Sequence, residues 1–214
     1  MDRRQALSRV ALILGGTIIG AEAFLSGCKT ESKKEGLFAA DDIALLDEVG
    51  ETILPTTTAS PGAKAAQIGA FMKTIVTDCY TEDDQRIFTD GIGKLNDAAK
   101  KKYDKPFMDL TPEQRTEFLI ALDKEAKDHD KEITDRASKL SDEEKHKRKL
   151  EQNAGTYKRD AADDPHYFGM MKQLTLWGFF TSKPGATQAL RYKAVPGSYQ
   201  GCIPYKKGDK AWAT

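Results

Sequence analysis

One segment of this 214-residue chain constrains the fold more than any other, because it has almost no polar face. From Asp164 to Ser182 the sequence reads DPHYFGMMKQLTLWGFFTS, with Asp164 and Pro165 as the predicted start of a helix. Its large apolar side chains are Tyr167, Phe168, Met170, Met171, Leu174, Leu176, Trp177, Phe179 and Phe180. A helix that is apolar nearly all round is buried on most sides. We therefore expect it to be the central core helix, or a helix whose exposed side is completed by another subunit.

Four segments before it show the spacing of amphipathic helices, with apolar residues three and four positions apart. The first begins after the caps Asp41 and Asp42 and ends before Pro55, and the second runs from Ala65 to Tyr80. The third follows a Thr81 cap and runs to about residue 102. The fourth begins at Thr111-Pro112-Glu113-Gln114, a capping-box pattern with Pro at the first helical position. No alternating strand pattern is evident, so the prediction is a mainly α chain.

A charged stretch follows the fourth helix. From residue 123 to 151 about two thirds of the residues are charged, with both signs interspersed. Such a run buries little surface, which favours a solvated helical extension or mobile insertion over a docking arm for a partner. His129 and His146 lie inside it and are expected at the surface rather than as metal ligands.

The first 28 residues have the organisation of an export signal with a lipid-attachment site. Val10 to Leu25 is mostly apolar, with Glu22 as its single charge, but it is shorter than a membrane-spanning helix needs. Leu25-Ser26-Gly27-Cys28 resembles the bacterial lipobox, in which the cysteine is lipidated and becomes the first mature residue. The alternative is an uncleaved anchor with a chance cysteine. We favour the lipoprotein, with Cys28 as the lipidated residue.

The adjacent pair Arg3-Arg4 suggests a twin-arginine signal, although any positive signal region carries basic residues. The residues after the pair match that motif only loosely, so both export routes stay open. The predicted organisation is then a signal peptide over 1–27, a polar tether over 28–36 and one helical domain over 37–214. This domain ends in an extended segment rich in Gly and Pro.

Cys79 and Cys202 are the remaining cysteines. In an oxidising compartment a disulfide between them would stabilise the fold, and the alternative is two separate buried thiols. Neither belongs to a CxxC motif, which argues against a thioredoxin-like or haem-attachment site.

No catalytic template is satisfied elsewhere. The formal net charge of zero does not suggest nucleic-acid binding. The acidic pairs Asp41-Asp42, Asp83-Asp84 and Asp163-Asp164 fall where helix caps are expected, so capping is favoured over acid–base catalysis. His166 is more consistent with a local hydrogen bond in a first helical turn than with a catalytic role.

Two blocks of the chain resemble a known family. The segment LWGFFTSKPGATQALRYKAVPGSYQGCIPY, residues 176–205, is similar to the closing signature of the gluconate 2-dehydrogenase subunit 3 family. The segment LDEVGETILPTTTASPGAKAAQIGAFM, residues 45–72, is similar to its opening signature. The charged stretch between them is not part of the resemblance.

Membership would imply a small, non-catalytic subunit without a cofactor of its own. It would bind, mature or co-export a flavoprotein of the glucose-methanol-choline (GMC) type, which carries FAD and oxidises a sugar, sugar acid or polyol. A c-type cytochrome often takes the electrons, and the lipid on Cys28 would hold the complex on the periplasmic side of a bacterial membrane. The alternative is a stand-alone structural or ligand-binding helical lipoprotein.

Large rings near the end of the chain are the candidates for a partner interface, because aromatic side chains dominate many interfaces. The candidate residues are Trp177, Phe179, Phe180, Tyr192, Pro196, Tyr199 and Tyr205. For the Gly- and Pro-rich end of the chain, the alternative is a loop that covers the domain's own core.

Overall fold

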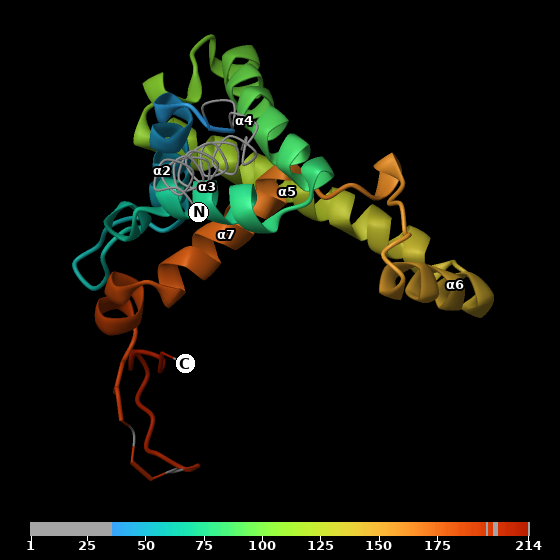
Figure 1. Cartoon of the computed structure of the whole chain (residues 1–214). Helices are drawn as coiled ribbons and strands as arrows, with labels where there is room; N and C mark the ends of the chain where they lie inside the picture. The colour runs from blue at the N-terminus through green and yellow to red at the C-terminus, as the bar shows by residue number, and fades with distance from the viewer. Residues whose placement is uncertain (1–35, 196, 199–200, 214) are drawn as a thin grey trace, which may run out of the picture. The chain divides into compact units, whose positions relative to one another are not determined.

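The computed structural model describes residues 36–195, 197–198 and 201–213, which are mainly helical and contain no β-strand (Figure 1). The α-helices are α2 (Ala40–Ile53), α3 (Ile68–Cys79), α4 (Glu82–Tyr103), α5 (Pro112–Ser138), α6 (Asp142–Asn153) and α7 (Tyr167–Thr181). Short helical turns complete them: η1 (Ala63–Ala66), η2 (Phe107–Asp109), η3 (Ala161–Asp163) and η4 (Gly185–Ala189). This confirms the predicted fold class. The predicted signal peptide and most of the tether, with Arg3, Arg4 and Cys28, lie outside the described residues.

Helix α7 is the core of the domain, as its composition predicts. It contacts α2, α3, α4 and α5. Phe168, Met171, Leu174 and Phe179 on this helix are all buried. Thr175 is buried with them, and its hydroxyl donates to the carbonyl of Met171 at 2.8 Å, which satisfies the only polar side chain on the buried faces of this helix.

The segment from Ala65 to Tyr80 differs from the prediction of one continuous helix. It begins as η1, and Gln67 then interrupts it with a left-handed backbone, φ 52°. Helix α3 begins only at Ile68, where the Gly69 N–H donates to the Asp47 carboxylate of α2 at 2.8 Å. A Cβ at Gly69 would lie 2.3 Å from the carbonyl oxygen of Ile43, so the contact between α2 and α3 requires glycine there.

The start signals of α4 and α5 are confirmed. The Thr81 hydroxyl accepts from the Asp84 N–H at 3.3 Å at the start of α4. At the start of α5, the Thr111 hydroxyl accepts from the Gln114 N–H at 3.3 Å, and the Gln114 side chain accepts from the Thr111 N–H at 3.0 Å. Both caps are local, and they form as the sequence indicates.

The charged stretch is a helical extension, as predicted. It forms the second half of α5, a turn, and α6, and no residue of α6 is buried. Ion pairs four residues apart, such as Lys124 with Asp128 and Lys127 with Asp123, lie along the α5 part of this extension.

Helix α7 begins later than predicted, at Tyr167 rather than Asp164. Its cap is His166, whose Nδ1 accepts from the Phe168 N–H at 3.2 Å. The prediction that Asp163 and Asp164 cap a helix is wrong, because arginine side chains bind these carboxylates. Arg159 donates to Asp164 at 2.8 Å and to Asp84 of α4 at 2.6 Å.

Asp163 has two arginine partners. Its carboxylate lies 3.3 Å from Arg136 Nε of α5 and 3.4 Å from Arg148 Nη1 of α6. These pairs and the Arg159 pairs attach the connector between α6 and α7 to the helices around it. The connector in turn fixes the position at which α7 enters the core.

Candidate partner-binding surface

The C-terminal half of α7 combines core residues with an exposed apolar edge. Leu176, Trp177 and Phe180 are exposed, and Trp177 retains 51% of its accessible surface. Phe180 follows Leu176 by four residues and Trp177 by three, so its ring neighbours both on the helix surface. Large apolar side chains gathered on one side of a helix are typical of a surface that another molecule covers.

Trp177 packs against an aromatic ring of the neighbouring helix α3. Its indole ring meets the ring of Phe71 on α3 edge to face, with centroids 5.4 Å apart. Gly178 permits this approach, because a Cβ at that position would lie 2.5 Å from a ring carbon of Phe71. Edge-to-face packing is a favourable arrangement of two aromatic rings and favours one orientation of the indole. Trp177 is therefore a pre-positioned ring with one side free.

Phe180 and Phe179 are adjacent in sequence but have opposite environments. Phe180 is 40% exposed, whereas Phe179 is 2% exposed and belongs to the core. The prediction that Phe179 lies at a partner interface is therefore wrong. Its ring touches that of Phe180 at 5.2 Å between centroids, so Phe179 supports the exposed ring from inside.

Beyond α7 the chain forms η4 and then the extended segment that the Gly and Pro content predicts. Tyr192 and Tyr205, two of the predicted interface rings, are exposed there. Two others, Pro196 and Tyr199, lie outside the described residues. Sequence reasoning did not single out Trp212, whose exposed indole ring faces the Arg191 guanidinium at 4.5 Å from the ring centroid. An arginine 21 residues away gives no local signal of this contact.

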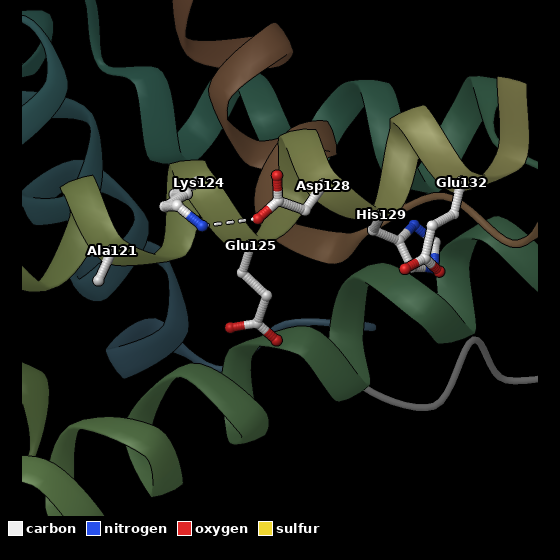
Figure 2. Close-up of a pocket in the computed structure, with 6 residues that line it drawn as sticks. All are labelled: Ala121, Lys124, Glu125, Asp128, His129 and Glu132. Carbon is white, nitrogen blue, oxygen red and sulfur yellow. Dashed lines mark hydrogen bonds and ion pairs between the residues drawn. The ribbon is translucent and has the colours of Figure 1, made fainter. Parts of the chain in front are cut away.

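A second feature is a titratable cluster between α5 and the start of α7. A hollow of about 400 Å³ lies over α5 (Figure 2). Its lining residues are Ala121, Lys124, Glu125, Asp128, His129 and Glu132. The His129 ring lies 5.8 Å from that of His166 between centroids, and Glu125 lies 3.7 Å from His166 Nε2. His129 is partly buried where it lines this hollow, and His146 is exposed as expected.

The environment of His166 favours its neutral form. Burial lowers the pKa of His166, the Glu125 carboxylate opposes this, and His129 lowers it further. Burial, with a smaller effect of Glu125, raises the pKa of the neighbouring Tyr167 to about 12. The local hydrogen bond predicted for His166 is confirmed. Among the described residues no group of three or more His, Cys, Asp or Glu side chains could hold a metal ion.

Cys79 and Cys202 are both exposed and free in the structure. The disulfide that the sequence left open is not formed. Because both thiols are exposed, the alternative of two separate buried thiols is wrong as well. In the described part of the chain, no helix is both long enough and apolar enough to cross a membrane.

The comparisons with known proteins gave one match. The family model described as gluconate 2-dehydrogenase subunit 3 matches residues 40–197. Comparison with curated proteins and comparison with solved structures gave no match. The matched range includes the charged stretch of α5 and α6, which the sequence resemblance had left out, and it ends before Tyr199 and Tyr205.

Proposed function

Because the chain belongs to the gluconate 2-dehydrogenase subunit 3 family, and is thus a small subunit of a dehydrogenase complex, we propose that it is a non-catalytic accessory subunit. It binds a GMC-type flavoprotein, supports the maturation of that protein and takes part in its export. The flavoprotein carries FAD and oxidises a sugar, sugar acid or polyol, and a c-type cytochrome accepts the electrons. The flavoprotein, not this chain, sets the substrate.

The observation that carries this proposal is the exposed edge of α7. The most buried helix of the domain leaves Trp177 and Phe180 uncovered, and their rings pack against the partly buried Phe71 and the buried Phe179. Rigid aromatic side chains lose little conformational freedom on binding, which makes them effective anchors of an interface. A partner subunit that covers this edge would complete the burial of α7.

The export of the complex follows from the chemistry of the cofactor. A flavoprotein that acquires FAD in the cytoplasm must fold there, and a folded protein needs a twin-arginine signal to cross the membrane. We propose that residues 1–27, with Arg3 and Arg4, supply this signal for both subunits. Lipid attachment at Cys28 then holds the complex on the periplasmic side of a membrane, near its electron acceptor.

The experiment that tests the proposal is purification of the tagged, full-length protein from its native host in mild detergent. We expect a flavoprotein in one-to-one ratio, identified by mass spectrometry and by its flavin absorption spectrum. Trp177→Ala should lower the recovery of the flavoprotein. Leu150→Ala, which removes an exposed apolar side chain from α6, is the matched control and should leave the recovery unchanged.

A colourless monomer, from cells that express a flavoprotein of this type, would contradict the accessory role. It would favour the stand-alone helical lipoprotein instead. Dehydrogenase activity or a bound flavin in the purified chain alone would contradict the non-catalytic part of the proposal.

A further inference from the structure

The charge of this chain is divided unevenly along its length. Between residues 36 and 182 there are 28 acidic and 21 basic side chains, whereas from 183 to 214 six basic side chains face a single acidic one. The six are Lys183, Arg191, Lys193, Lys206, Lys207 and Lys210. We call the described residues from Arg191 to Trp212 the C-terminal arm. A basic arm on an acidic body indicates an interaction outside the body itself.

The acidic body does not neutralise the arm. Among the described residues, none of these six side chains lies in an ion pair with a carboxylate. Lys210 Nζ reaches the body, but its partners are the backbone carbonyls of Ala59, at 3.2 Å, and of Gln188. The positive charge of the arm therefore remains available to an acidic partner.

The base of the arm is fixed. The Arg191 N–H donates to the Ala211 carbonyl at 2.8 Å, and the Arg191 carbonyl accepts from the Ala213 N–H at 2.7 Å. The Arg191 guanidinium also lies 4.5 Å from the centroid of the Trp212 ring. These contacts join both ends of the arm, so it leaves the domain as a closed loop. Because both ends are fixed, the arm loses less conformational entropy when it binds a partner.

The middle of the arm exposes rings and open backbone. Tyr192 and Tyr205 are exposed, as are Val195 and Ile203. From Tyr192 to Val195 and from Gly201 to Tyr205 the backbone belongs to no helix or strand and forms no hydrogen bond with another described residue. Pro196, Tyr199 and Gln200 lie outside the described residues and are not part of the site.

The open backbone distinguishes between two kinds of partner for a basic, aromatic arm. A lipid surface attracts Lys and aromatic rings, but its apolar interior offers nothing to pair with extended backbone N–H and C=O groups. A protein groove supplies both acidic side chains and backbone partners, as in recognition by strand addition. The unpaired backbone therefore favours a protein.

We propose that the C-terminal arm binds an acidic groove on the flavoprotein subunit, as a second contact beside the exposed edge of α7. Lys193, Lys206 and Lys207 supply the charge that meets the acidic side chains. Tyr192 and Tyr205 enter apolar sites of the same groove, between its acidic side chains. This inference rests on the proposed accessory function and adds to it the chemistry of the partner's surface.

The test measures the affinity of the full-length chain for the purified flavoprotein subunit in detergent, over a salt range of about 0.05 to 0.3 M. The arm variant carries Lys193→Gln, Lys206→Gln and Lys207→Gln. The control variant carries Lys145→Gln, Lys147→Gln and Lys149→Gln on α6, which removes the same charge from exposed positions elsewhere. We expect the arm variant to bind on the order of tenfold more weakly at low salt, with a smaller salt dependence, and the control to bind as the unmodified chain does.

Three results would overturn the proposal and leave the accessory function standing: equal affinity of the arm variant and the unmodified chain, an equal loss in the control variant, or an arm variant that loses only its binding to phosphatidylglycerol vesicles. The last result would assign the arm to the membrane. If the unmodified chain does not bind the flavoprotein at all, the proposed function fails instead. Tyr192→Ala with Tyr205→Ala, at unchanged helicity, should weaken binding at every salt concentration, because the contribution of the rings is not screened.

Discussion

The imidazole rings of His129 and His166 lie 5.8 Å apart between centroids, although α5 carries one and the connector before α7 carries the other. His166 Nδ1 accepts a hydrogen bond from the Phe168 N–H and so caps the helix on which the core is built. A protonated imidazole has no acceptor nitrogen, so protonation removes this cap. The hydrogen bond from the Phe168 N–H to His166 therefore makes the start of α7 sensitive to pH.

The first prediction concerns this pH dependence. Burial holds the pKa of His166 below its ordinary value, so the unfolded chain takes up the proton first as pH falls. The stability that neutral His166 contributes is fully present above about pH 6.5 and is lost as pH falls from there through the lower pKa of the folded state. His166→Asn keeps a capping side chain that does not titrate. We expect the unmodified chain to lose about 1 kcal/mol relative to this variant between about pH 7 and pH 5.

Urea denaturation at a series of pH values, followed by circular dichroism, measures this difference. His146→Asn, which changes an exposed histidine on α6, serves as the control and should follow the unmodified chain. Parallel pH profiles for the unmodified chain and His166→Asn would show that His166 does not titrate in this range. Glu125, His129 and Asp130 also act on His166, so the profile reports the cluster rather than one isolated group.

The second prediction separates core from surface on α7. Phe179→Ala removes a buried ring and should destabilise the fold by about 3–5 kcal/mol. Trp177→Ala loses one edge-to-face contact with Phe71, worth about 0.5–1.5 kcal/mol, and the burial of about half of its surface, so it should cost less than Phe179→Ala. Thermal unfolding with flavoprotein binding as a second readout gives the comparison. A Trp177→Ala variant as unstable as Phe179→Ala would mean that Trp177 serves the fold rather than an interface.

The third prediction compares two glycines of the same helix. A Cβ at Gly178 would lie 2.5 Å from Phe71 and 3.1 Å from Ile68, whereas a Cβ at Gly169 would meet nothing within 4 Å. Gly178→Ala should therefore destabilise the domain by about 1–3 kcal/mol. Gly169→Ala should stabilise it by about 0.5–1 kcal/mol, because alanine restricts the unfolded chain. Denaturant midpoints of the two variants should shift in opposite directions, and shifts of the same sign would contradict the packing at Gly178.

Some parts of the fold could be predicted from the sequence. The caps at Thr81 and Thr111 depend on residues three positions away, and the burial of α7 depends on composition alone, so both could be predicted. The burial of Phe179 and the exposure of Phe180 could not be predicted from the sequence. A helix that is apolar all round carries no periodic signal of which side its neighbours leave open.

Contacts between distant segments explain the other differences. Helix α3 begins at Ile68 because the Asp47 side chain, more than twenty residues earlier, binds the Gly69 N–H. The hydrogen bond between His166 and Phe168 was predictable as a local contact, but the approach of His129 depends on how α5 packs against the connector. The rings near the end of the chain predicted a candidate partner-binding surface, and the buried position of Phe179 removes that residue from the candidates.

The fourth prediction concerns the arginine that holds the connector before α7. Arg159 donates to Asp84 at 2.6 Å and to Asp164 at 2.8 Å, and all three side chains are mostly buried. Arg159→Gln leaves two carboxylates without their cation, so we expect a loss of about 1–3 kcal/mol. Arg86→Gln is the matched control, because Arg86 pairs with Asp83 at 3.0 Å on the open surface and should cost less than about 1 kcal/mol.

Urea denaturation measures both losses, and hydrogen exchange locates the first. In Arg159→Gln the faster exchange should concentrate in residues 154–168, because the connector and the first turn of α7 lose their attachment to α4. If both variants lose the same stability, or if exchange rises equally across the domain, the Arg159 bridge is one more surface contact and does not set the position of α7.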